Sequence, residues 1–223
     1  MKHTKDNDFD GAAHVLLVTR KRGRVMRKKM YIVLTDTGTL LSKAIGMYTR
    51  EDLNHVSIAF DEQLTEMYSF GRKHRHNPFT GGFVKEDATE GMFEYANCAI
   101  YSCDVTDEAY DKMRSRIREF EQTKELYKYN FIGLFAVAVN RDFERKHAYF
   151  CSQFVATIIN ECGIQMFTVP PNLVQPHHFA KVTYLQPVFH GNLQGYLQNV
   201  RGSVYSTQTK LNLWQHVRSR MFA

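Results

Sequence analysis

The sequence has no apolar run long enough to cross a membrane. Its longest apolar stretch spans residues 131–139 and is interrupted by Gly133, whereas a transmembrane helix needs about 20 apolar residues. At the N-terminus, acidic side chains and a short apolar patch come before a basic run. That order is wrong for a secretory signal peptide, and we therefore expect a cytoplasmic protein.

Cysteine is scarce, and its spacing does not fit the usual metal motifs. The four cysteines are Cys98, Cys103, Cys151 and Cys162, and no two of them form a CxxC pair. A cytoplasmic chain keeps such thiols reduced, so we expect neither a disulfide framework nor a zinc site. No metal and no cofactor is predicted. Each cysteine is then either a small buried hydrophobic residue or a reactive thiol.

Positive charge is concentrated in one segment of the chain. The formal net charge is +6, and seven basic residues lie between Arg20 and Lys29. Without them the chain would be close to neutral. Such a run can contact an anionic membrane surface or a phosphate-rich partner, or it can be a solvated segment ahead of the first strand. No aromatic residue interrupts it, so no specific nucleic-acid partner is predicted.

Length and composition predict one main domain. The chain has 223 residues, of which 43% are hydrophobic and 23% charged, and this suffices for one sizeable core. We expect a basic N-terminal lead-in over residues 1–29, a catalytic domain over 30–190 and a C-terminal extension over 191–223. The oligomeric state is left open.

Apolar and β-branched runs predict a set of short strands, and two longer periodic segments predict helices. The expected strands cover residues 31–34, 55–60, 64–70, 93–103 and 182–185. The expected helices cover residues 107–126, with Thr106 as N-cap, and 151–162, with Gly163 at the stop. Residues 130–139 are expected to form an apolar helical or buried segment. The pattern favours the α+β class.

A long irregular loop is expected over residues 71–91. This stretch is rich in glycine and also contains proline and asparagine, and long loops in compact domains often border functional sites. Glu86 and Asp87 within it could bind a substrate amine, or they could simply be solvated loop charges.

Cys151 stands where the apolar helical pattern begins. A cysteine in the first turn of a helix faces unpaired N–H groups and the positive end of the helix dipole, and both favour the thiolate. A thiolate can attack a carbonyl carbon while nearby N–H groups hold the oxyanion. The alternative is a buried helix cysteine, and the spacing alone does not choose between the two.

Among ten histidines, His55 is the best candidate for a general base because a histidine that opens a strand is rigidly aimed. The group that orients it depends on the turn between the two strands. A turn of two or four residues places Glu66 and Tyr68 on the face of His55, and a turn of three residues places Met67 and Ser69 there. Glu66 is favoured because a carboxylate fixes the tautomer and stabilises imidazolium; Ser69 and Tyr68 are the alternatives.

Four short motifs follow one another in a defined order: His-Val-Ser-Ile at 55–58, Met-Tyr-Ser-Phe at 67–70, Tyr-Asn-Phe-Ile-Gly-Leu at 129–134 and Tyr-Phe-Cys-Ser-Gln-Phe-Val at 149–155. In order and spacing they resemble the circularly permuted branch of the NlpC-type papain-like superfamily, in which the histidine strand precedes the cysteine helix. The lecithin:retinol acyltransferase-like proteins share this order. The resemblance covers roughly residues 30–185.

The resemblance implies a papain-like fold, with a small antiparallel sheet packed against helices and the cysteine at a helix N-terminus. It also implies a cysteine hydrolase, either an amidase or peptidase or a thioesterase-like enzyme, or else an acyltransferase. Cys151 would be the nucleophile and His55 the general base, and the amide or ester bond of a peptide or acyl-type small molecule would be cleaved through an acyl-enzyme. The alternative is a non-catalytic module of the same fold that binds a ligand or lipid.

Overall fold

The computed structural model describes residues 27–36, 52–74, 77–129 and 148–203 of the chain. The predicted apolar segment at 130–139 lies outside these residues, as do residues 20–26 of the basic run and residues 204–223 of the C-terminal extension. No helix within the described residues is long and apolar enough to cross a membrane.

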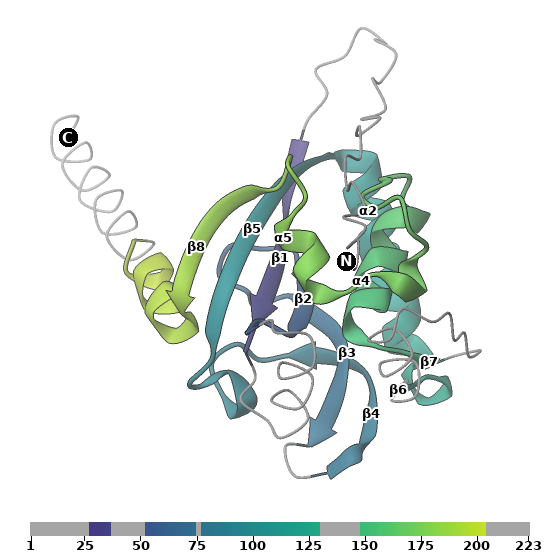
Figure 1. Ribbon diagram of the computed structural model, residues 1–223, viewed down its shortest axis with the longest axis horizontal. Helices are drawn as coiled ribbons and strands as arrows, with labels where there is room; N and C mark the ends of the chain where they lie inside the picture. The colour runs from purple at the N-terminus through teal and green to yellow at the C-terminus, as the bar shows by residue number, and fades with distance from the viewer. Residues whose placement is uncertain (1–26, 37–51, 75–76, 130–147, 204–223) are drawn as a thin grey trace, which may run out of the picture.

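A six-stranded sheet forms the centre of the molecule, with the strand order β4-β3-β2-β1-β5-β8 and every neighbouring pair antiparallel (Figure 1). Its strands are β1 (Arg27–Thr35), β2 (His55–Ala59), β3 (Met67–His74), β4 (Asn77–Glu86), β5 (Asn97–Thr106) and β8 (Gln186–Asn192). The short strands β6 (Lys128–Tyr129) and β7 (Ala148–Tyr149) form a separate parallel pair.

Three α-helices and three short 3-10 turns complete the labelled elements. They are α2 (Asp107–Gln122), α4 (Cys151–Glu161), α5 (Pro176–Ala180), η1 (Gly91–Phe93), η2 (Lys124–Leu126) and η3 (Pro171–Leu173). Residues 193–203, directly after β8, are also helical. The antiparallel sheet with its helices confirms the predicted α+β class.

Two apolar clusters lie on opposite faces of the sheet, because side chains alternate along each strand. On one face, Ile32 and Ile58 pack with the buried sides of α2 and α4. Within this cluster the ring of Phe154 lies 5.0 Å from that of Phe70 and 5.3 Å from that of Phe120, measured between centroids. The other face packs against η1 and the helix of residues 193–203.

The two main helices begin and end for identifiable reasons. The Thr106 hydroxyl accepts a hydrogen bond from the Ala109 N–H at 3.2 Å, which confirms the predicted N-cap of α2. This helix ends at Gln122, four residues earlier than predicted, and η2 follows. Helix α4 begins at Cys151, and Gly163 follows its C-terminus at φ 83°, a conformation that favours glycine.

The loop predicted over residues 71–91 is wrong. Most of this stretch forms the end of β3 and the whole of β4, paired as a hairpin. Proline is compatible with strand here because β4 is the last strand of the sheet, and proline within sheets is confined to such edge positions. At Gly82 a Cβ would lie only 2.9 Å from the backbone oxygen of Tyr127, so close approach of the chain requires glycine.

Several strand boundaries also differ from expectation; the strand expected over 93–103, for example, is β5 at Asn97–Thr106. Residues 182–185 are not strand, and the last strand of the sheet begins at Gln186. At the N-terminal side, β1 begins at Arg27, so the last three residues of the basic run belong to the sheet and are exposed there. Lys28 among them forms an ion pair with Asp111 of α2 at 3.0 Å.

Candidate active site

A buried ion pair links the first residue of β2 to the last residue of β4. The Nε2 atom of His55 lies 2.8 Å from Oε1 of Glu86, and the two side chains are only 10% and 6% exposed. A charged group buried this deeply must be paired or hydrogen-bonded. The two side chains therefore act as one unit that is largely shielded from solvent.

Two serine hydroxyls complete the surroundings of the carboxylate. Ser57 donates to Oε2 of Glu86 at 2.5 Å, and Ser69 donates to Oε1 at 2.6 Å. The strand register explains why these residues meet: Met67 pairs with Ala59 on one side and with Glu86 on the other. Alternation then places Ser57, Ser69 and Glu86 on the same face of the sheet as His55.

The Glu86 contact determines which histidine nitrogen can act as a base. An ionised carboxylate only accepts hydrogen bonds, so Nε2 of His55 carries a proton and donates it to Glu86. In the neutral ring Nδ1 is then the unprotonated nitrogen, available to a second group. Cys151 also acts on the ring, because its side chain is among the groups that raise the pKa of His55.

The same neighbours set the proton affinity of the imidazole. Burial alone would lower the pKa of His55, but the negative charge of Glu86 and the hydrogen bonds to Cys151 and Glu86 outweigh burial and raise the pKa to about 10. At neutral pH the imidazolium form is thus favoured.

Cys151 differs in its surroundings from the other three cysteines. Burial raises the pKa of Cys98 to about 12 and the pKa of Cys103 and Cys162 to about 11, so these three remain protonated thiols near neutral pH. Cys151 is also buried, with 2% of its surface exposed, yet it contacts His55. The first residue of α4 and the first residue of β2 therefore meet at one end of the sheet.

Glu66, the favoured third group, lies elsewhere. It immediately precedes β3 and forms a two-pronged ion pair with Arg114 of α2, in which Nη2 of Arg114 lies 2.7 Å from Oε1 of Glu66. The reason is the length of the turn. The Phe60 N–H donates to the Glu66 carbonyl at 3.1 Å, and this hydrogen bond closes a turn of residues 61–65. Because the number of residues in the turn is odd, Ser69 rather than Glu66 lies on the face of His55.

Of the alternatives, Ser69 reaches the site and Tyr68 does not. Tyr68 lies on the opposite face, stacked on Phe83 with centroids 5.9 Å apart. Ser69 contacts Glu86 and acts on the carboxylate. Sequence reasoning placed Glu86 in a loop as a possible contact for a substrate amine, and thus missed its position at the end of a strand and its contact with His55. The apolar residues just before it, Phe83 and Val84, were the signal that it could end a strand.

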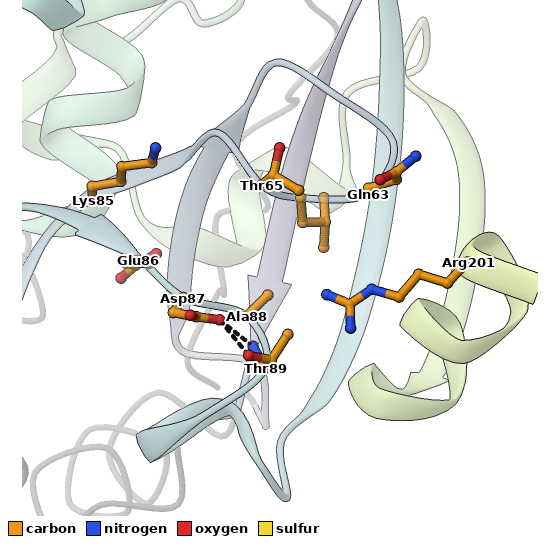
Figure 2. A pocket seen from close by; sticks show the side chains of 9 residues that line it. Gln63, Thr65, Lys85, Glu86, Asp87, Ala88, Thr89 and Arg201 are labelled. Atoms are coloured by element: carbon orange, nitrogen blue, oxygen red, sulfur yellow. Dashed lines mark hydrogen bonds between the residues drawn. The ribbon is translucent and has the colours of Figure 1, made fainter. Parts of the chain in front are cut away.

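A polar pocket of about 370 Å³ adjoins the site through Glu86 (Figure 2). The guanidinium of Arg201 extends into it, and on the opposite wall Asp87 accepts hydrogen bonds from the backbone and hydroxyl of Thr89 at 2.8 and 2.6 Å. Lys85 also lines it, and its Nζ lies 5.9 Å from the centroid of the Tyr68 ring. The remaining lining residues are Gln63, Leu64, Thr65 and Ala88.

Comparisons with known proteins assign no family to this arrangement. The chain matches no protein-family model, no curated protein and no solved structure. Within the described residues, no group of three or more histidine, cysteine, aspartate or glutamate side chains is placed to hold a metal ion. The functional argument therefore depends on the geometry around His55.

Proposed function

We propose that this protein is a cysteine hydrolase or acyltransferase of the permuted papain-like type, acting on an amide or ester bond of a peptide or acyl-type substrate. One observation carries the proposal: a buried imidazole is held by a carboxylate and interacts with a cysteine at the first residue of a helix. Nucleophile, base and orienting group in contact are the arrangement that thiol catalysis requires.

The first half-reaction uses the thiolate–imidazolium pair. The sulfur of Cys151 attacks the carbonyl carbon, a C–S bond forms, and the carbonyl electron pair moves onto oxygen. Backbone N–H groups in the first turn of α4 are suited to bind this oxyanion, since the N-cap residue Phe150 makes no side-chain hydrogen bond to them. The proton of Nδ1 of His55 then passes to the leaving group, and the original C–N or C–O bond breaks.

The second half-reaction reverses these roles. Neutral Nδ1 of His55 takes a proton from water, or from an acceptor hydroxyl or amine, which attacks the thioester carbonyl. The C–S bond breaks, the acyl group leaves as an acid or is transferred, and the protonated imidazole again faces the thiolate. In both half-reactions the carboxylate of Glu86 holds the Nε2 proton and stabilises the positive ring.

Selective alkylation tests the proposal without knowledge of the substrate. Iodoacetamide is added to the full chain between pH 5 and 10, and each cysteine is followed by peptide mass spectrometry. We expect Cys151 to react well below the pH at which Cys98 and Cys103 react, and His55→Ala to move this reaction to higher pH. Cys98→Ala is the matched control and leaves the profile of Cys151 unchanged.

Acyl transfer provides the second readout. With p-nitrophenyl acetate, we expect a burst of nitrophenol and an acetylated Cys151 peptide, absent in Cys151→Ala and reduced at least about 100-fold in His55→Ala. If Cys151 reacts like a free thiol and is indifferent to His55, the enzyme proposal fails. A binding module of the same fold would then be the better hypothesis.

A further inference from the structure

Ser57 and Ser69 lie on the face of the sheet that also carries His55 and Glu86. Both are fully buried, and their neighbours on this face include Val33, Ala59 and Met67. A buried hydroxyl without a partner is costly. Here both hydroxyls donate to the same carboxylate.

The carboxylate and the histidine belong to strands that are not neighbours in the sheet. Glu86 belongs to β4, which is two strands away from β2, and β3 lies between them. On β3, a Cβ at Gly71 would lie 3.4 Å from the Ser69 hydroxyl oxygen and 3.7 Å from both Oε1 of Glu86 and Cε1 of His55. A Cβ alone fits there, whereas a longer side chain would have to enter the space where carboxylate and ring meet.

We propose that Ser57 and Ser69 are positioning residues, whose hydroxyls hold Glu86 against Nε2 of His55, and that Gly71 supplies the space for this contact. The catalytic consequence rests on the function proposed above, but the positioning itself does not. The bond from Ser57 also approaches the ring, with its hydroxyl oxygen 3.3 Å from Nε2. The two serines thus fix the carboxylate at both oxygens.

A positioning role and a purely electronic role predict effects of opposite sign. Hydroxyl donors withdraw charge from a carboxylate, so their removal from an immobile Glu86 would strengthen its attraction for the imidazolium and raise the pKa of His55. If the hydroxyls position Glu86, their removal lets the carboxylate turn away, and the pKa of His55 falls. The titratable groups that act on His55 are Glu86 from β4 and Cys151 from α4, and both are retained in the serine variants.

NMR titration of the His55 ring in the full chain measures this sign directly, whether or not the protein is an enzyme. We expect Ser57→Ala and Ser69→Ala each to lower the pKa of His55 by roughly one unit, equivalent to a tenfold loss of proton affinity. The double variant should lower it further. Ser69→Thr keeps the hydroxyl and should restore the wild-type value.

Ser102→Ala is the matched control, since Ser102 is a buried serine on the same face of the sheet, where β5 pairs with β1. It should leave the titration of His55 unchanged. At position 71, Gly71→Ala should also leave it unchanged, because a Cβ fits, whereas Gly71→Val should lower the pKa of His55. If Gly71→Val does not fold, the serine variants and Gly71→Ala still decide the question.

The outcomes separate this proposal from the proposed function. An unchanged or higher pKa of His55 in both serine variants overturns the positioning role, even if Cys151 is a nucleophile. If the pKa of His55 falls in these variants but Cys151 is unreactive, the positioning role is supported and the enzyme proposal is refuted. If the positioning role and the enzyme proposal are both right, the serine variants that lower the pKa of His55 most should also make the alkylation of Cys151 depend most strongly on pH.

Discussion

Glu86→Gln is the change that most directly tests the site, since it removes one charge and keeps the shape of the side chain. Two unit charges about 4 Å apart, at the effective dielectric constant typical of protein sites, attract by about 4 kcal/mol. His55 and Glu86 are in direct contact and both are buried. The loss of that attraction corresponds to roughly three pKa units. Because burial then lowers the pKa without the opposing charge of Glu86, we expect the pKa of His55 to fall from about 10 to its ordinary value of 6.5 or below.

The assay is the alkylation of Cys151 with iodoacetamide as a function of pH, with NMR titration of His55 alongside. In the wild-type protein the imidazolium persists through the neutral range, so alkylation should vary little between pH 6 and 9. In Glu86→Gln the ring loses its proton near neutrality and no longer stabilises the thiolate. Alkylation should then rise steeply with pH over the same interval.

Glu66→Gln is the matched control, because it makes the same chemical change in a carboxylate that pairs with Arg114 instead. Both of these side chains are 32% exposed, and a partly exposed pair of this kind contributes about 1 kcal/mol or less to stability. We expect an unchanged alkylation profile. If Glu86→Gln behaves like wild type, or if Glu66→Gln shifts the profile, the assignment of Glu86 is refuted.

Two further predictions concern stability. The pKa of His55 in the folded protein, about 10, exceeds its ordinary value of 6.5, so the folded state binds this proton more tightly than the unfolded state does. The protonated ring therefore contributes its full stabilisation below pH 6.5 and loses it as the pH rises to 10. The loss in unfolding free energy is on the order of 5 kcal/mol. Urea unfolding should follow this loss in the wild type, and His55→Gln should remove it; an equal slope in both proteins would contradict the linkage. Phe154→Ala leaves a cavity among the rings of Phe70, Phe83 and Phe120 and should cost about 3–5 kcal/mol of unfolding free energy; a cost below 1 kcal/mol in urea titration would contradict a close-packed cluster.

The elements that sequence analysis predicted well are those whose signals are local. Helix α2 has an apolar stripe at helical spacing and the side chain of Thr106 as its cap, and both lie within the segment itself. Strand β2 is a short apolar run with clear flanks. By contrast, β4 contains Pro78 and two adjacent glycines, which indicate a loop when only neighbouring residues are considered. Its strand conformation depends on pairing with β3 and on its place at the end of the sheet.

The residues of the candidate site differ in the same way in how well the sequence predicted them. Cys151 and His55 could be selected from the sequence because each opens a regular element, and the start of an element gives a side chain a defined direction. Whether they meet, and which carboxylate joins them, depended on the register of three strands. The odd number of residues in the turn at 61–65 turned Glu66 toward Arg114, and the pairing of β4 with β3 brought Glu86 to the histidine. Parity and register are properties of paired strands, so only the tertiary structure could decide the third group.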